Sequence, residues 1–195
     1  MAELSPMMKQ YMEVKAQNKG SILFFRLGDF YEMFFDDAIL VSKELELTLT
    51  GRDCGQEERA PMCGVPYHSC ESYIARLIKK GYKVAICEQM ENPALAKGLV
   101  KREVTRVITP GTIVEGSLLD EAKNNYIASV HMQDGILGLC FIDISTGEIQ
   151  MTQIPAREDA VQKLQTELGR FMPAEVMISS PVEQLGINEV ECPLL

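Results

Sequence analysis

The sequence lacks the features that would place it in a membrane or on a secretory route. None of its apolar runs approaches the roughly 18 residues that a membrane-spanning helix needs. The segment from Met1 to Gly20 is polar and has no apolar core of the kind found in signal peptides. With 24% charged and 46% hydrophobic residues in 195, the composition is not that of a disordered chain either. We therefore expect a folded cytoplasmic protein of one large or two small domains, with no membrane partner.

The six cysteines include no C-x-x-C pair. Without such pairs and without a secretory signal, we do not expect a disulfide framework. Four residues could be assembled into a zinc site, although structural zinc sites usually have more closely paired ligands. These residues are Cys54, Cys63, His68 and Cys70. We favour buried or spare thiols over a metal site.

The sequence also has no excess of basic over acidic residues, because its net charge is −9. This value argues at first against a nucleic-acid partner. The charge is unevenly distributed, however. Residues 1–110 contain 15 basic and 15 acidic side chains, whereas residues 111–195 contain 4 and 13. The asymmetry predicts two modules with different roles, of which the first is neutral and the second acidic.

Apolar periodicity and turn residues predict alternating helices and strands in the first module. Ser5 and Pro6 form a helix start, and the Gly-, Pro- and charge-rich segment 51–66 is expected to be a long functional loop. The expected helices are 6 to about 20, 34–45 and 69–80, and the expected strands are 21–26, 46–50, 82–89 and 100–109. Four basic residues alternate with apolar ones in and just before the last strand, and a solvated sheet face is favoured for them over contact with DNA; they are Lys97, Lys101, Arg102 and Arg106.

The second module has the pattern strand, strand, strand, helix, strand, which is typical of a mixed α/β domain. Asp134-Gly135 is a strong hairpin signal between its first two strands. The expected strands are 126–132, 136–143, 148–154 and 175–179, and the expected helix is 157–168, ending at Gly169. We predict a first domain at 1–110, a linker at 111–124 and a second domain at 125–195.

Six of the 13 phenylalanine and tyrosine residues lie between Phe24 and Phe35, and most of them are expected in the core. Phe30 differs because it follows the turn residues Gly28-Asp29. If the chain is extended there, Phe30 and Glu32 share one face and Tyr31 lies on the other. Such a ring could wedge between base steps, stack on an unpaired base, or simply staple the following helix, which periodicity alone favours.

At these residues the sequence resembles the MutS family of bacterial mismatch-repair proteins. The matching motifs are long, follow the family's order and extend over most of the chain. They are FFRLGDFYEMFFDDA (24–38), ELTLTGR (46–52), APMCGVPYH (60–68), VAICEQMENPALAKGLVKREVTRVITPGT (84–112) and FIDISTGE (141–148). The resemblance implies an α/β fold: a mixed-sheet mismatch-recognition domain followed by an incomplete ribonuclease-H-like connector domain.

The resemblance also implies roles for particular residues. Phe30 matches the ring that stacks on a mispaired base from the minor groove, and Glu32 matches the carboxylate that hydrogen-bonds that base. Leu27 stands where many members carry Met, a conservative departure that preserves van der Waals contact. Three further residues match motif positions in loops near the DNA: Arg52, Met62 and His68.

Partners and cofactors follow from the same resemblance. Family members bind double-stranded DNA containing mismatches or small loops, act as dimers and engage downstream mismatch-repair proteins. Their ATPase domain, with ATP and Mg, would lie beyond Leu195, and the chain contains no G-x-x-x-x-G-K-[ST] motif. We therefore expect no enzymatic activity, cofactor or metal in this chain itself.

Two alternatives remain for the second module. A ribonuclease-H-like fold can be a metal-dependent nuclease, which needs clustered carboxylates. Asp143 and Glu148 flank a turn and are better explained as turn-forming residues, so we favour a non-catalytic connector. The acidic charge also fits an adaptor that binds another protein.

Overall fold

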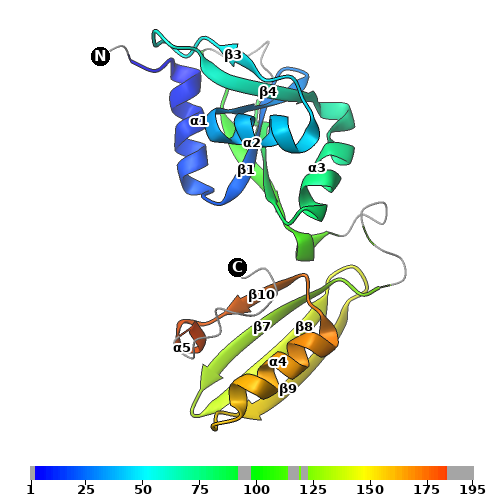
Figure 1. Ribbon diagram of the computed structural model, residues 1–195. Helices are drawn as coiled ribbons and strands as arrows, with labels where there is room; N and C mark the ends of the chain where they lie inside the picture. The colour runs from blue at the N-terminus through cyan, green and yellow to red at the C-terminus, as the bar shows by residue number, and fades with distance from the viewer. Residues whose placement is uncertain (1–2, 92–97, 114–118, 120–122, 184–195) are drawn as a thin grey trace. The chain divides into compact units, whose positions relative to one another are not determined.

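The structure is a computed structural model that describes residues 3–91, 98–113, 119 and 123–183. It divides the chain into two compact units, Met1–Thr109 and Pro110–Leu195 (Figure 1). Each unit has a mixed sheet with helices packed against it, so the prediction of an α/β chain with mixed sheets is confirmed. No helix in the described part of the chain is long and apolar enough to cross a membrane.

A six-stranded sheet in the order β3-β4-β2-β1-β5-β6 forms the centre of the first unit. β1 and β5 are parallel, and the other neighbouring pairs are antiparallel. The first five residues of β1 are all buried, as expected for an apolar strand covered on both faces. The strands are β1 (Ser21–Leu27), β2 (Phe30–Phe34), β3 (Thr50–Arg52), β4 (Ala60–Pro66), β5 (Lys83–Gln89) and β6 (Arg102–Ile108).

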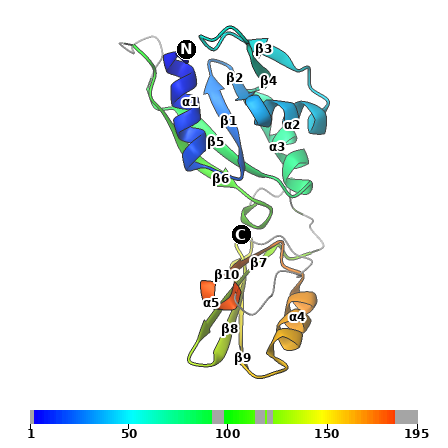
Figure 2. The same ribbon diagram turned by 60° about the vertical axis from the view of Figure 1, so that its left-hand side comes forward.

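Helix α1 covers one face of this sheet, and α2 and α3 cover the other (Figure 2). The predicted start of α1 is confirmed, because the Met8 N–H donates to the Ser5 hydroxyl at 3.4 Å, with Pro in the first turn. Tyr11 packs edge-on against Phe25 and Phe34, with ring centroids 5.3 and 5.0 Å away. The helices are α1 (Pro6–Gln17), α2 (Phe35–Leu45) and α3 (Cys70–Lys79).

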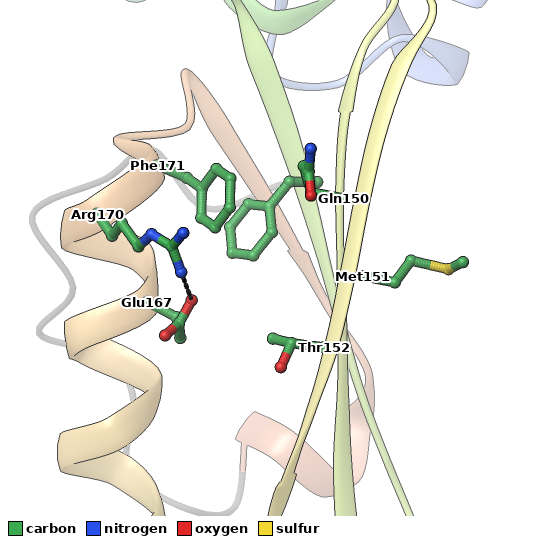
Figure 3. A pocket seen from close by; sticks show the side chains of 7 residues that line it. Gln150, Met151, Thr152, Glu167, Arg170 and Phe171 are labelled. Carbon is green, nitrogen blue, oxygen red and sulfur yellow. Dashed lines mark ion pairs between the residues drawn. The ribbon is translucent and has the colours of Figure 1, made fainter.

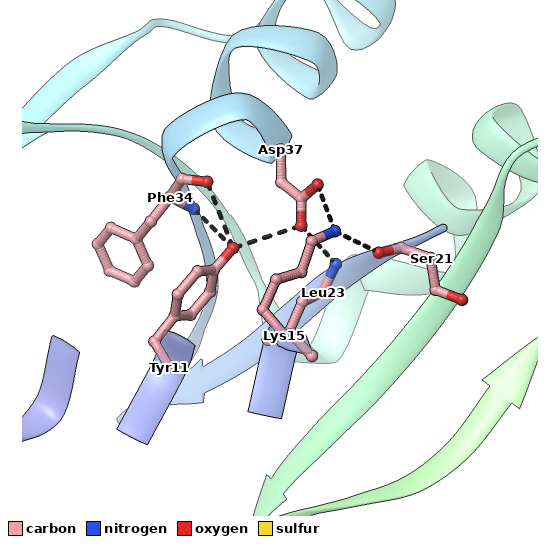
Figure 4. A network of polar contacts seen from close by, with 6 residues as sticks. All are labelled: Tyr11, Lys15, Ser21, Leu23, Phe34 and Asp37. Atoms are coloured by element: carbon pink, nitrogen blue, oxygen red, sulfur yellow. Dashed lines mark hydrogen bonds and ion pairs between the residues drawn. The ribbon is translucent and has the colours of Figure 1, made fainter. Parts of the chain in front are cut away.

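A buried carboxylate connects α1, β1 and α2 (Figure 4). Asp37 accepts hydrogen bonds from the Leu23 backbone N–H at 2.9 Å and from the Lys15 ammonium at 2.8 Å. The Tyr11 hydroxyl lies 3.3 Å from the same carboxylate, and its pKa is raised by burial and further by the Asp37 charge. Because the pairing of β1 with β2 ends at Phe25, the Asp37 side chain replaces a strand partner for Leu23.

The second unit contains a four-stranded sheet in the order β10-β7-β8-β9. β7, β8 and β9 are antiparallel, and β10 joins β7 in parallel. Helix α4 covers one face of the sheet and buries Ala160, Leu164 and Leu168 in its core. The elements are β7 (Tyr126–Gln133), β8 (Ile136–Asp143), β9 (Glu148–Pro155), α4 (Ala160–Phe171), β10 (Glu175–Ile178) and α5 (Ser180–Glu183).

The opposite face of this second sheet carries exposed apolar side chains. Met177, Cys140 and Met151 belong to one row of paired residues that crosses the sheet from β10 to β9. Met151 is 77% exposed and points away from α4 (Figure 3). Ile149, two residues earlier on β9, is also exposed. Among the described residues, therefore, one face of the sheet is a packed core and the other is exposed.

A shallow pocket of about 190 Å³ lies between α4 and the strands β8 and β9 (Figure 3). Phe171 stacks on Phe141 at its edge, with ring centroids 4.0 Å apart. Arg170 forms an ion pair with Glu167 at 3.6 Å along the same helix. The ring stack fixes the last turn of α4 against the sheet, so the pocket is a by-product of helix packing.

Two predictions of secondary structure in the first unit were wrong. Residues 46–49 are not a strand, because α2 ends at Glu46 in a left-handed conformation (φ 59°) and β3 begins only at Thr50. The segment 51–66 is not one long loop, because it contains most of β3 and all of β4, which pairs with both β2 and β3. Two prolines and a glycine concealed the strand pattern of β4, and pairing on both sides overrode these local preferences.

The second unit differs from expectation at its helix and near its beginning. α4 begins at Ala160 and continues through Gly169 to Phe171, and Met172 ends it in a left-handed conformation (φ 44°). Gly111 is buried in the short turn η2 (Pro110–Thr112), and its N–H donates to Glu175 at 3.1 Å. Residues 114–118 and 120–122 of the predicted linker lie outside the described residues.

Candidate nucleic-acid interface

The aromatic tip lies at the turn between β1 and β2. Gly28 has a φ of +59°, a left-handed conformation that glycine adopts readily, and Phe30 begins β2 two residues later. Because β2 is extended, Phe30 and Glu32 lie on one face of the sheet and Tyr31 on the other, as predicted. Phe30 is 46% exposed, whereas Tyr31 is buried. The tip therefore presents a phenylalanine to solvent from the end of a paired strand.

Neighbouring strands hold this tip on both sides. Phe30 pairs with Leu27 of β1 and with Pro66 of β4. The N–H of Tyr67, immediately after β4, donates to the Asp29 carbonyl at 3.0 Å. The turn is thus attached to two other segments by backbone pairing, which restricts its motion.

A cluster of side chains around Arg26 lies next to the tip, and its contacts were not predicted from the sequence. The Arg26 guanidinium carbon lies 3.5 Å from the Tyr67 ring centroid and 5.5 Å from that of Tyr31. Arg26 also lies 3.8 Å from the Glu88 carboxylate, to which the Tyr31 hydroxyl donates a hydrogen bond. Burial, followed by the Glu88 carboxylate, raises the pKa of Tyr31. The one available signal was a cation inside an otherwise apolar strand.

Glu32 forms an ion pair with Arg52 of β3. The Glu32 side chain is only 15% exposed and that of Arg52 is 38% exposed. In the sheet, Glu32 pairs with Gly64 of β4, the strand that lies between β2 and β3. Glu32 is therefore a neutralised carboxylate beside Phe30, and two of the predicted site residues are in direct contact.

The other three predicted site residues differ in their positions. Leu27 is partly exposed and pairs directly with Phe30. Met62 lies partly buried on β4, on the core side where α1 packs. His68 is exposed in the short turn η1 (Tyr67–Ser69), where its ring lies edge-on to Tyr67 at 5.6 Å. The geometry therefore groups Leu27, Phe30, Glu32 and Arg52. Met62, two residues from Gly64 on β4, lies on the same face of the sheet as Glu32, whereas His68 lies in the turn after β4.

Arg102 does not lie on a solvated face, contrary to prediction. It is 8% exposed, its guanidinium lies 5.0 Å from the Phe25 ring centroid, and it donates to the Arg26 carbonyl at 2.8 Å. It also donates to the Gln10 side chain and to the Val100 carbonyl. Its role is to connect α1, β1 and β6 inside the first unit.

The cysteines that could have formed a zinc site behave as separate thiols. Cys54 and Cys63 are buried, and their Sγ atoms contact the carbonyl oxygens of Glu58 and Ala38. Burial, followed by the charge of Asp37, raises the pKa of Cys63 to about 12. Both Sγ atoms are thus turned toward backbone carbonyls rather than toward one another.

Asp143 is a turn-forming residue, as predicted. Its carboxylate accepts hydrogen bonds from the Ser145 N–H at 2.9 Å, the Ser145 hydroxyl at 2.6 Å and the Asn125 N–H at 3.0 Å. Glu148 accepts from Asn124 at 2.8 Å and from Gln150 at 3.1 Å. Within the described ranges, no three His, Cys, Asp or Glu residues are grouped so that they could hold a metal ion.

Comparison of the sequence with known protein families identifies the two units. Residues 5–117 match the family model of MutS domain I, and residues 125–191 match that of MutS domain II. The two α/β units are therefore domains of a mismatch-repair type of protein. The chain belongs to the MutS family.

Several similar proteins carry the name DNA mismatch repair protein MutS. One from Acetivibrio thermocellus is 59% identical over 179 residues, which is 92% of this chain. One from Ruminiclostridium cellulolyticum is 57% identical over 180 residues, and one from Caldicellulosiruptor bescii is 57% identical over 185 residues, which cover 92% and 95% of this chain. The matches cover 20%, 20% and 21% of these relatives, so the chain spans about a fifth of their length.

Proposed function

We propose that this chain recognises mismatched sites in double-stranded DNA, with Phe30 stacking on a mispaired or unpaired base from the minor groove. The observation that carries the proposal is the half-exposed Phe30 ring at the end of a strand paired on both sides. Membership of the MutS family supports the same function, because the relatives are named as DNA mismatch repair proteins.

Phe30 suits this task because a mismatch is better detected by deformability than by one pattern of base edges. Mismatches differ in chemistry, but a mispaired site kinks and unstacks at a lower cost than a paired one. Separating two base steps costs a few kcal/mol, and stacking on an aromatic ring restores about 1–3 kcal/mol per base. The balance therefore favours insertion only where the duplex is already weakened.

Glu32 supplies selectivity rather than affinity. Arg52 compensates the Glu32 charge in part. The repulsion that remains between this carboxylate and the phosphates weakens binding to every duplex, and an unpaired base that donates a hydrogen bond offsets this loss. The first module has equal numbers of acidic and basic side chains, which keeps its general attraction to DNA low. Leu27, paired with Phe30, is positioned for van der Waals contact in the same groove.

The remaining partners belong to the family's longer proteins. We propose that the complete protein dimerises, contacts downstream mismatch-repair proteins and binds ATP and Mg in parts outside this chain. The second unit serves as a non-catalytic connector. A protein-binding adaptor role is a second candidate for this unit, favoured by the exposed Met151 and Ile149 and by the acidic charge of residues 111–195.

The substitution Phe30→Ala tests the proposal in the complete protein that contains this chain. Fluorescence anisotropy would measure the Kd for a matched duplex and for the same duplex with one unpaired base. We expect the ratio of the two values to fall by roughly 5- to 150-fold, because a stacking contribution of about 1–3 kcal/mol is lost.

Ile39→Ala is a matched control, because Ile39 is a half-exposed apolar residue on α2 of the same unit. It should leave the ratio unchanged. A Phe30→Ala protein that still prefers the mismatched duplex as strongly as the unchanged protein would contradict the proposal.

A further inference from the structure

The ion pair between Glu32 and Arg52 links two strands that are not neighbours in the sheet. β4 separates β2 from β3, so the pair spans an intervening strand. At the position opposite Glu32, β4 carries Gly64. A Cβ atom there would lie 3.4 Å from the Glu32 Cγ and 3.2 Å from the Tyr31 carbonyl oxygen. The Glu32 side chain therefore packs against the backbone of β4 at Gly64, which has no side chain, and extends from there to Arg52.

The ion pair engages one oxygen of the carboxylate. Arg52 Nη1 donates to Glu32 Oε2, and among the described residues Oε1 accepts no hydrogen bond. A free glutamate side chain has three rotatable bonds and loses considerable freedom when it is ordered. Here that freedom is already lost, because the backbone of β4 limits the side chain on one side and Arg52 holds its end. The second oxygen is thus held in a fixed position on the face that carries Phe30.

We infer that Arg52 is a specificity-determining residue that acts through Glu32. It neutralises the carboxylate and fixes its orientation, so that Oε1 is ready to accept a hydrogen bond from a base displaced beside Phe30. This inference rests on the proposed function and adds to it. A simpler role for Arg52 is contact with a DNA phosphate, which would strengthen binding to every duplex without reading sequence or mismatch.

A double-mutant cycle separates these two roles. The proteins are the complete parent protein, Glu32→Ala, Arg52→Gln and the double variant Glu32→Ala/Arg52→Gln. The measured quantity is the ratio of the Kd for a matched duplex to the Kd for the same duplex with one unpaired base. We expect Arg52→Gln to lower this ratio about three- to fivefold, the range of a partly exposed ion pair. In the Glu32→Ala background, Arg52→Gln should not change the ratio further.

Two additional variants test whether the effect on the ratio is specific to the Arg52 side chain. Arg52→Lys keeps the charge but loses the planar fork, so we expect it to restore part of the ratio. Arg59→Gln removes a cation from the same β3–β4 connection, where Arg59 is exposed. It should weaken binding to both duplexes equally and leave the ratio unchanged. Circular dichroism of each variant confirms that the fold is retained.

The outcomes distinguish this inference from the proposed function. An unchanged ratio in Arg52→Gln, or an equal fall of the ratio in the presence and absence of Glu32, would overturn the role of Arg52. If Phe30→Ala also leaves the ratio unchanged, the proposed function fails as well. If Phe30→Ala abolishes the preference while the cycle shows no coupling, only the inference about Arg52 fails.

Discussion

The two sheets of this protein expose apolar side chains in different ways. In the first unit, the exposed Phe30 stands beside an ion pair and at the end of a strand with partners on both sides. In the second unit, Met151, Ile149 and Met177 are spread over one whole face of the sheet. A single fixed ring suits recognition that depends on geometry, whereas a broad apolar face suits packing against another surface.

We expect the largest effect from a substitution in the buried network around Asp37 in the first unit. Asp37→Ala removes the acceptor for the backbone N–H of the buried Leu23 and for the ammonium of the partly buried Lys15. We expect the free energy of unfolding of that unit to fall by about 3 kcal/mol, because the buried Leu23 N–H loses its acceptor and the partly buried Lys15 ammonium keeps only its bond to the Ser21 carbonyl. Urea denaturation measures the loss, and hydrogen exchange at the Leu23 amide locates it.

Asp36→Ala is the matched control for this network, since Asp36 is exposed one residue earlier in the same helix turn. It should change the free energy of unfolding by less than about 0.5 kcal/mol. Equal losses in the two variants would mean that helix-dipole charge, and not the buried network, stabilises this region.

The second unit allows its two sheet faces to be compared directly. Leu164 of α4 is fully buried, and Leu164→Ala should cost about 2–3 kcal/mol in unfolding free energy. Met151→Ala, on the opposite face, should change it by less than about 0.5 kcal/mol. Urea denaturation followed by hydrogen exchange of the β7 and β8 amides provides both values. A large cost for Met151→Ala would show that this face is also covered.

The smallest expected effect concerns the pH dependence of the Asp143 turn. Burial acts to raise the pKa of Asp143, but the hydrogen bonds from Ser145, Asn125 and Thr146 together lower it below its ordinary value. A carboxylate with a lowered folded-state pKa stabilises the fold above its unfolded pKa of about 3.9, and this contribution is lost as the pH falls toward the folded value.

The stability difference between the parent protein and Asp143→Asn should therefore be constant from about pH 7 to pH 5 and shrink below about pH 4. Denaturant titrations at several pH values measure this difference. Ser145→Ala removes one hydroxyl donor and should give a smaller pH-dependent change. A difference that grows as the pH falls would contradict the lowered pKa.

Local sequence patterns were sufficient for the parts of the site that depend on one strand. Alternation placed Phe30 and Glu32 on a common face, and the turn residues before them indicated an exposed tip. The same reasoning failed for β4, whose prolines and glycine are typical of loops. Its strand conformation depends on β2 and β3, and no local pattern carries information about that pairing.

The features of the site that were not predicted depend on contacts between residues that are far apart in the sequence. Arg52 was expected near DNA, but its partner Glu32 lies 20 positions earlier and two strands away. Arg102 was assigned to solvent from an alternating pattern, yet its side chain lies over Phe25, more than 70 residues away in sequence. Periodicity distinguishes the two faces of a strand, but it does not tell which charged side chain is enclosed by the rest of the fold.

The backbone bond from Tyr67 to the Asp29 carbonyl has a mechanical consequence. Together with the strand pairing of Phe30, it makes the turn a stiff support rather than a flexible finger. When a stiff body and a softer one are pressed together, the softer one deforms. In the proposed function, a base step loosened by a mismatch would deform more readily than this turn, so the bend would fall on the duplex while the phenylalanine ring keeps its position.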